Sequence, residues 1–257
     1  MIFDSHAHYD DEQFDEDREN LLDSMEARGI GYIVNVGSSM ETCRHTIEIV
    51  KRFTHVYGAL GIHPGETEEL NEEKFEWLKK SLSKPKIVAV GEIGLDYHWA
   101  DPDRQVQKYW FERQLELARE KELPFIIHSR DAAADTLEIM KAHKAGEIGG
   151  VIHCFSYGKE IAKEYLDMGL YLGIGGVVTF ANSRKLKEVV EYAPIEQLVL
   201  ETDCPYLAPV PNRGKRNSSI NLPYVANEIA RIKNMAPQEV IDITCANAIK
   251  MYDIKIN

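Results

Sequence analysis

Two histidines near the start of the chain, His6 and His8, are separated by one residue within a short, largely apolar stretch. Side chains along a β-strand alternate between its two faces, so both imidazoles point to the same side of such a strand. Packing alone does not explain two polar rings on one face, whereas two neutral imidazoles suit a divalent cation. The spacing therefore predicts a metal site at the end of the first strand.

Further imidazole and carboxyl groups stand at the ends of later apolar runs. Such groups are rarely buried without a partner, and together they suit Zn²⁺, Mn²⁺, Co²⁺ or Ni²⁺, with Mg²⁺ where oxygen ligands dominate. A single catalytic zinc takes about three or four protein ligands, so a larger set favours two metal ions. We predict that the metal ligands are His6, His8, Glu92, His128, His153 and Asp203.

The elements that would carry these groups alternate between short apolar runs and amphipathic helices. Most of the runs are continuously apolar, which is typical of a parallel sheet that is covered on both faces. Helical spacing of apolar residues follows several of them, for example at Cys43, Ile47 and Val50. Eight candidate strands lie at residues 1–6, 32–36, 56–62, 87–92, 124–128, 151–153, 170–174 and 197–201.

This alternation predicts an α/β fold, a (β/α)8 TIM barrel formed by residues 1–257 as a single domain. Such a barrel takes about 250 residues, and the chain has 257. A doubly wound open sheet is the alternative, but it requires a glycine-rich loop after the first strand, where this chain has His6-Ala7-His8. In a barrel the active site lies at the carboxyl ends of the strands, so the predicted ligands converge on one mouth.

Strand alternation also places residues beside the predicted ligands. Glu201 falls on the side of Asp203, and Asp4 falls on the side of His6, where both can fix the orientation of ligands. Arg130 lies near His128 if that strand extends far enough.

Composition and charge exclude several classes of protein. Lys and Arg number 30 against 42 Asp and Glu, and the net charge of −12 argues against broad wrapping of nucleic acid. No apolar run approaches the ~20 residues of a membrane span, and we expect no secretory signal. The four cysteines are widely spaced, as expected for free thiols in a reducing compartment. We therefore expect a cytoplasmic protein, and no obligate protein partner is inferred.

Several motifs resemble those of a known family. Residues 2–10, Ile-Phe-Asp-Ser-His-Ala-His-Tyr-Asp, resemble the opening signature of the TatD family of metal-dependent hydrolases, within the amidohydrolase superfamily. Segments 61–64, 91–97, 124–130, 200–205 and 211–217 are similar to its later signatures, so the resemblance covers nearly the whole chain. It implies a deoxyribonuclease that cleaves phosphodiester bonds through a metal-activated water, as a 3′-5′ exonuclease on single-stranded DNA or 3′ ends.

The resemblance also implies how the ligands divide between two divalent cations, which would be Mg²⁺, Mn²⁺ or Zn²⁺. Many amidohydrolases bridge their metals with a carboxylated lysine, whereas this chain has Glu92 at the corresponding strand end, in agreement with the TatD branch. One cation would take His6, His8, Glu92 and Asp203, and the other would take Glu92, His128 and His153.

Catalytic roles are expected for Asp203, Glu92 and His63. Asp203 would accept the proton of the attacking water and pass it towards the leaving oxygen, while His63 would donate to a phosphate oxygen. We expect the substrate to be bound by His63, Arg130, Arg213 and Lys215.

The loop after the last candidate strand is a local exception to the acidic balance, since it carries Arg213, Lys215 and Arg216. With Arg130 these residues could receive a phosphate backbone, and such contacts predict little base specificity. A solvated charged loop is the alternative interpretation.

Two other functions fit the same residues. A metal-dependent amide or ester hydrolase, such as an aminoacyl-tRNA deacylase, would keep the metals and cleave a different bond. A non-catalytic metal-containing module that binds nucleic acid is a candidate from another class, although the presence of Asp203 beside a full ligand set argues against it. A barrel without a chemical role leaves the buried imidazoles without a reason.

Overall fold

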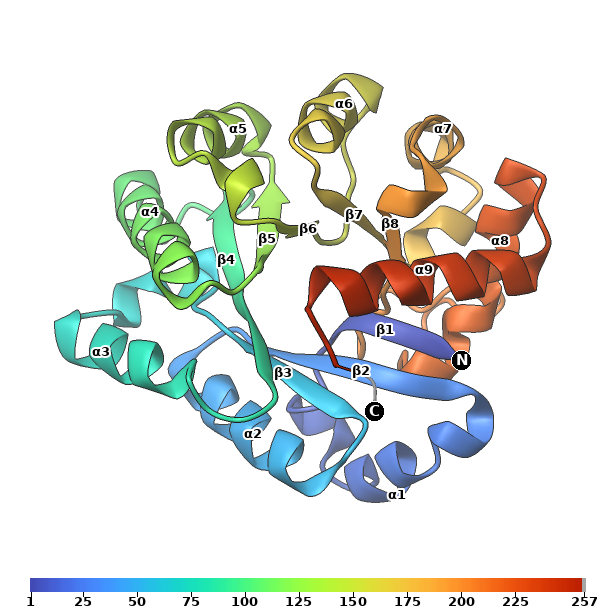
Figure 1. Ribbon diagram of the computed structural model, residues 1–257, viewed down its shortest axis with the longest axis horizontal. Helices are drawn as coiled ribbons and strands as arrows, with labels where there is room; N and C mark the ends of the chain where they lie inside the picture. The colour runs from blue at the N-terminus through green and yellow to red at the C-terminus, as the bar shows by residue number, and fades with distance from the viewer. Residues whose placement is uncertain (256–257) are drawn as a thin grey trace.

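A computed structural model describes residues 1–255, and within them eight parallel strands form one sheet whose spatial order follows the chain (Figure 1). Each predicted run overlaps one of these strands. The strands are β1 Ile2–Ala7, β2 Ile30–Gly37, β3 Val56–Leu60, β4 Ile87–Asp96, β5 Phe125–Arg130, β6 Gly150–Ile152, β7 Tyr171–Ile174 and β8 Leu198–Leu200.

The sheet closes because β1 returns to the segment that contains β8. Ala7 forms a bridge with Cys204, and the Ser5 hydroxyl donates to the Leu200 carbonyl at 2.9 Å. The predicted (β/α)8 TIM barrel is therefore confirmed, and the open doubly wound sheet is wrong.

β4 extends furthest beyond its predicted end. β4 runs four residues beyond Glu92, to Asp96, because it keeps pairing with β5, with Gly94 opposite His128 and Asp96 opposite Arg130. Gly94 has φ +142°, and a Cβ there would lie 1.9 Å from the His128 carbonyl oxygen. Only glycine allows the two strands to approach so closely at this point.

Helices surround the strands on the outside (Figure 1). Their starts follow local signals: the Asp103 carboxylate accepts from the Gln105 N–H at the start of one helix, and Pro237 opens another. The helices are α1 Arg18–Asp23, α2 Met40–Arg52, α3 Glu72–Ser81, α4 Arg104–Lys121, α5 Ala133–Ala142, α6 Lys159–Asp167, α7 Arg184–Tyr192, α8 Leu222–Lys233 and α9 Pro237–Met251.

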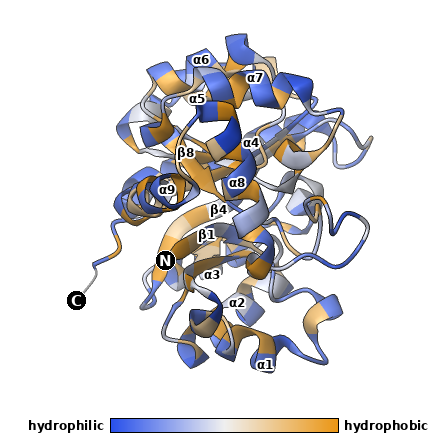
Figure 2. Ribbon diagram, turned by 90° about the vertical axis from the view of Figure 1, so that its right-hand side faces the viewer, coloured by the Kyte–Doolittle hydropathy of each residue, from blue (hydrophilic) through white to orange (hydrophobic). Residues whose placement is uncertain are grey.

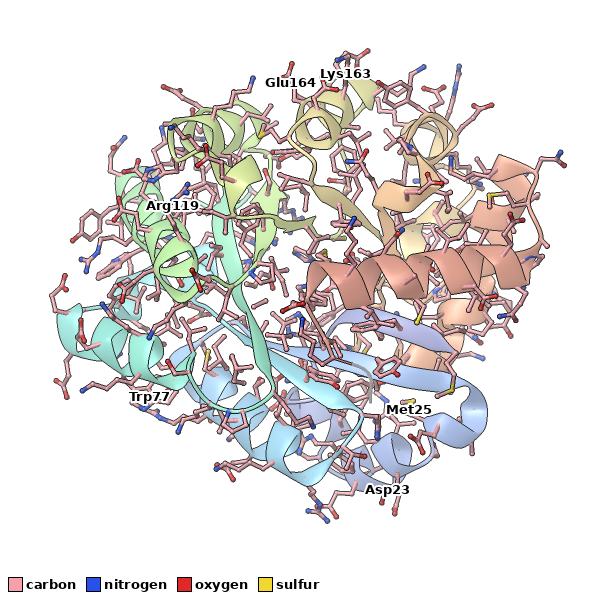
Figure 3. The ribbon with its side chains drawn as sticks, viewed as in Figure 1. Asp23, Met25, Trp77, Arg119, Lys163 and Glu164 are labelled. Carbon is pink, nitrogen blue, oxygen red and sulfur yellow. The ribbon has the colours of Figure 1, made fainter. Side chains whose placement is uncertain are left out.

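The core has two parts, one between strands and helices and one inside the barrel. Figure 2 shows hydrophobic strands enclosed by helices with polar outer faces, and in Figure 3 Lys163 and Glu164 project outward from α6. Inside the barrel, small apolar side chains such as Val34 and Val199 pack against Tyr252, just beyond the end of α9. The Tyr252 hydroxyl donates to the Ser5 carbonyl at 2.8 Å, so the C-terminal segment covers the amino end of the barrel.

The opposite end, where the carboxyl ends of the strands meet, is the mouth of the barrel and carries polar side chains. Among residues 1–255, every helix is too short or too polar to span a lipid bilayer.

Candidate metal centre

Four of the predicted ligands meet at the mouth of the barrel as one group of donor atoms. The Nε2 atoms of His6 and His8 are 3.0 Å apart, and His8 Nε2 is 3.3 Å from Asp203 Oδ1. Glu92 Oε2 lies 3.5 Å from His6 Nε2 and 3.8 Å from His8 Nε2. These atoms come from β1, β4 and the segment after β8, which are distant in the chain and adjacent in the barrel.

The remaining ligands form a second group around the other oxygen of Glu92. Glu92 Oε1 lies 2.7 Å from His128 Nδ1 and 2.7 Å from His153 Nε2, and these two nitrogens are 3.1 Å apart. The two oxygens of one buried carboxylate therefore face two separate sets of donors. This is the arrangement that a bridging carboxylate requires.

The backbone around Asp203 explains how that side chain reaches the group. Asp203 has φ +55°, a left-handed conformation that is uncommon for a residue other than glycine. Its N–H donates to the His6 carbonyl at 2.9 Å, which holds the residue against the end of β1. Strain of this kind persists when the surrounding contacts determine the conformation, and it is frequent at functional sites.

Asp4 links β1 to the segment after β8 through hydrogen bonds. Its carboxylate accepts from the Thr202 N–H and hydroxyl, from the Ser219 hydroxyl at 2.6 Å and from the His6 N–H at 3.3 Å. Burial raises the pKa of Asp4 to about 6. Asp4 thus acts on the ligands through the backbone and contacts no imidazole ring.

The charges of the two groups complement one another. Burial by itself lowers the pKa of His8, but the hydrogen bond to Asp203 and the charges of Asp203, Glu92 and Asp10 together outweigh it and raise the pKa to about 10. Burial also opposes the charge of His128, and Asp96 and Glu92 outweigh it to give a pKa of about 9. Burial disfavours ionisation of Glu92, but His153 and His128 hold the pKa of this carboxyl well below its usual range. The site thus stabilises anionic carboxylates and takes up positive charge.

Glu201 lies beneath the ligands, inside the barrel. It is fully buried, which raises the pKa of its carboxyl to about 8, and its Oε1 accepts from the Cys154 N–H at 2.5 Å. The buried atoms without a hydrogen-bond partner in residues 1–255 include Glu201 Oε2, His6 Nδ1 and His153 Nδ1. These three residues offer ligand atoms within 4.8 Å of one another, and the His6 and His153 rings stack at 4.0 Å.

The unpaired atoms are explained if cations occupy the mouth. With Nε2 of His6 and of His153 directed at a metal ion, each Nδ1 carries a proton that faces the Glu201 carboxylate. The donor set and these buried polar atoms fit divalent cations. Space for Glu201 depends on Gly173, where a Cβ would lie 2.1 Å from Oε2.

His63 stands at the rim of the site. Its Nδ1 accepts from the Gly65 N–H at 3.0 Å, so the ring proton is on Nε2, which lies 3.8 Å from Glu92 Oε1. Burial and the neighbouring His128 lower the pKa of His63 to about 4, so the ring is neutral at pH 7. His63 therefore presents an N–H donor towards the centre.

Asp96 is a residue that the sequence interpretation missed. Its Oδ2 lies 3.3 Å from His128 Nε2, and this contact turns Nδ1 of the ring towards Glu92. Asp96 lies four residues after Glu92, an even spacing that puts both on one face of a continuous strand. The signal was present, but it required β4 to extend beyond Glu92.

The predicted substrate-binding residues Arg130, Arg213 and Lys215 line two adjoining cavities at the mouth of the barrel. Arg130 lines a cavity of about 320 Å³ together with His128, His153 and Asp203. Arg213 and Lys215 line an adjoining cavity of about 480 Å³, and Leu207 borders both. Arg213 stacks over the Phe180 ring at 4.3 Å.

Arg216, the third basic residue predicted in this loop, lines the same cavity as Arg213 and Lys215, but its charge is already paired. Its guanidinium binds the Asp17 carboxylate at 2.6 Å and stacks over Phe14 at 4.7 Å. It therefore anchors the loop to the segment after β1.

Comparisons with known proteins agree with this architecture. A family model described as TatD related DNase matches residues 3–253. The uncharacterized metal-dependent hydrolase YabD of Bacillus subtilis is 42% identical over 254 residues, covering 99% of this chain and 100% of the relative. The 3′-5′ ssDNA/RNA exonuclease TatD of Citrobacter rodentium is 29% identical over 260 residues, covering 99% of each chain.

Among solved structures, the TatD homologue YJJV from Escherichia coli K12 matches with a TM-score of 0.93 and 28% identity, over 99% of this chain and 98% of that one. Since the family model matches almost the whole chain and a full-length relative shares 42% of its residues, this protein belongs to the TatD family of metal-dependent hydrolases.

Proposed function

We propose that this protein is a nuclease that removes nucleotides from the 3′ end of single-stranded DNA with the help of two divalent cations. The observation that carries the proposal is the division of donors around Glu92, whose two oxygens face separate ligand groups beside a cavity lined by Arg130. The exonuclease named among the relatives supports a nucleic-acid substrate.

The residues present suit two cations, either Mg²⁺, Mn²⁺ or Zn²⁺. When bound, such ions lower the pKa of water and offset negative charge on phosphoryl oxygens. One cation would be held by His6, His8, Glu92 and Asp203, and the other by Glu92, His128 and His153.

The side chains supply positioning and proton transfer. Asp203 accepts a proton from the attacking water and delivers it to the leaving 3′ oxygen as the bond from phosphorus to that oxygen breaks. His63 donates its Nε2 proton as a hydrogen bond to a nonbridging oxygen, and Arg130 pairs with the backbone. The products are a nucleoside 5′-monophosphate and a strand with a new 3′ hydroxyl.

The test of the proposal is product mapping with metal-loaded protein. We expect a 5′-labelled single-stranded oligonucleotide to shorten stepwise from its 3′ end, with two bound cations per chain by elemental analysis. Turnover of an amide or carboxylic ester without cleavage of DNA or RNA would instead support the deacylase alternative. Stoichiometric binding of nucleic acid without turnover would support a binding module.

A double charge reversal, Arg213→Glu with Lys215→Glu, is expected to weaken binding of single-stranded DNA. Each lost phosphate contact makes the plot of the logarithm of the binding constant against the logarithm of salt concentration less steep by ~0.7. Loss of two contacts makes it less steep by roughly 1.4. Binding is measured by fluorescence anisotropy at several salt concentrations. Lys250→Glu, an exposed change on α9 at the other end of the barrel, serves as the control. An unchanged slope would identify the loop as a solvated one.

The change Glu201→Gln is expected to weaken cation binding by roughly 10–100-fold, the usual effect of losing a carboxylate that orients metal-ligating histidines. Glutamine fills the same space but replaces one carboxyl oxygen, which can accept from the imidazole N–H groups of His6 and His153, by an amide nitrogen that only donates. Affinity is measured by calorimetry with Mn²⁺, independently of turnover. Glu196→Gln is an exposed control, and an affinity equal to that of the unmodified protein would remove Glu201 from this role.

A further inference from the structure

Basic and acidic side chains line different cavities at the mouth of the barrel. On one side of the candidate metal centre, the two adjoining cavities bordered by Leu207 carry Arg130, Arg213 and Lys215. Arg216 also lines the larger of them, but its charge is paired with Asp17. On the other side lies a third cavity of about 240 Å³, whose described lining contains no lysine or arginine. Apart from the metal ligands, its charged walls are Asp10, Asp11 and Glu66.

This acidic cavity opens directly on the reacting centre, because His8, His63 and Glu92 form part of its lining. It is small: ligand pockets usually measure ~300–1,000 Å³. A cavity of this size beside the centre accommodates one terminal residue of a polymer. Beyond Ser38, Thr42 and Glu66 it adjoins another cavity of about 440 Å³, which Arg44 and Lys74 line.

The carboxylates of the cavity are held in place by the fold. Asp10 is only 6% exposed, and its Oδ1 accepts from Asn35 Nδ2 at 2.7 Å. Asp11 accepts from the Gln13 N–H and from the Tyr206 hydroxyl, both at 2.8 Å. These contacts fix two negative charges at the wall of the cavity.

Glu66 completes the acidic wall from the 3₁₀ segment Pro64–Glu69, which begins directly after His63. Its side chain is exposed, so it can be changed without disturbing a buried contact. A phosphate placed in this cavity would meet carboxylates, and none of the residues that line the cavity itself is a lysine or arginine.

Tyr206 links the acidic cavity to the basic side. It lines both the 240 Å³ cavity and the cavity of Arg213, and 52% of it is exposed. An exposed aromatic ring at this position offers a stacking surface for a base, which tolerates any sequence.

We infer that the acidic cavity receives the terminal nucleoside of the strand and rejects an end that carries a further phosphate. The inference rests on the proposed nuclease function. The scissile phosphate lies at the centre, the retained strand follows the arginines and Lys215, and the terminal 3′ hydroxyl enters the acidic cavity. A 3′-phosphorylated end, or an internal linkage, would bring a second phosphate against Asp10, Asp11 and Glu66.

The reaction balances with water as the only co-reactant. Water adds to phosphorus, the bond to the 3′ oxygen of the penultimate nucleotide breaks, and that oxygen receives a proton. The released nucleotide keeps the scissile phosphate at its 5′ position and its own hydroxyl at the 3′ position. The charge of the cavity thus makes the enzyme act at ends, one residue at a time.

The experiment compares two 5′-labelled oligonucleotides of one sequence, one ending in a 3′ hydroxyl and the other in a 3′ phosphate. The readout is the ratio of kcat/KM for the two, with metal-loaded protein. We expect the phosphorylated end to be cleaved at least about tenfold less efficiently, because like charges are brought together. Glu66→Gln should bring this ratio of kcat/KM closer to one, and Glu66→Lys should bring it closer still. Glu68→Gln, an exposed change on the same segment outside the cavity lining, should leave the ratio unchanged.

Each result decides a separate point. Equal cleavage of the two ends, or a ratio that Glu66→Lys leaves as it was, overturns the inference while the proposed function stands. Failure of metal-loaded protein to cleave either oligonucleotide overturns the proposed function and the inference with it. A circular single strand, which has no end, should resist cleavage, and its efficient degradation would also overturn the inference.

Discussion

Replacing Asp203 by asparagine is expected to lower kcat by roughly 10²–10⁴-fold, the usual contribution of a general base. Burial opposes ionisation of Asp203, but the hydrogen bond to His8 and the charges of the neighbouring histidines together outweigh it and lower the pKa of the carboxyl. The side chain is therefore a carboxylate at neutral pH, able to take a proton from water. Asparagine keeps the shape and one oxygen but cannot accept that proton.

Single-turnover rates with saturating cation separate this effect from weaker metal binding. At saturating cation, the cation content and the melting temperature of Asp203→Asn should stay close to those of the unmodified protein, although loss of a ligand carboxylate lowers the affinity. Asp131→Asn changes an exposed aspartate next to the end of β5, whose carboxylate faces His98, and serves as a matched control. If Asp203→Asn turned over within a few fold of the unmodified rate, proton transfer would have to be assigned elsewhere.

Removal of the divalent cations is expected to abolish hydrolysis altogether, and addition of Mg²⁺, Mn²⁺ or Zn²⁺ is expected to restore it. Without cations the water nucleophile keeps its high pKa and the phosphoryl charge has no partner among the acidic groups of the centre. Cation at 100 times its dissociation constant should also stabilise the fold by about 2.7 kcal/mol, which raises the melting temperature. Dialysis against a chelator, followed by titration of each ion, measures both effects.

Cation affinity should decline as the pH falls. The pKa values of His8 and His128 are raised to about 10 and about 9, so protons compete with cations for these rings. Each proton displaced contributes up to one unit of log K per pH unit below the pKa, and calorimetry between pH 6 and 9 would show the slope. Full activity of cation-free protein, or an affinity that does not vary with pH, would contradict the assigned ligands.

The strands and the convergence of the ligands could be predicted because both follow from local pattern. An apolar run shows where a strand lies, and the rule that carboxyl ends meet at one mouth then brings His6, Glu92 and Asp203 together. That rule does not predict the distances between the side-chain atoms at the mouth. The separate roles of the two Glu92 oxygens, and the proximity of Glu201 to two rings, depend on how side chains pack inside the barrel.

Other features depended on partners far away in the chain. Arg216 is 199 residues from Asp17, so nothing in its neighbourhood indicates that its charge is already paired. The acidic cavity likewise combines Asp10 and Asp11 from the first loop with Glu66 from the third. Asp96 was missed for a different reason, since an apolar run does not reveal how long strand pairing continues.

The closure of the barrel between β1 and the segment after β8 has a consequence for protein synthesis. His6 and His8 are synthesised long before Asp203, which completes their group of donor atoms. Likewise, the Asp4 carboxylate has no partner until Thr202 is added 198 residues later. A ribosome that adds ~5–20 residues per second needs roughly 10–40 s to supply that segment. During this interval the nascent chain has no complete centre, so a growing polypeptide cannot yet carry out metal-dependent hydrolysis.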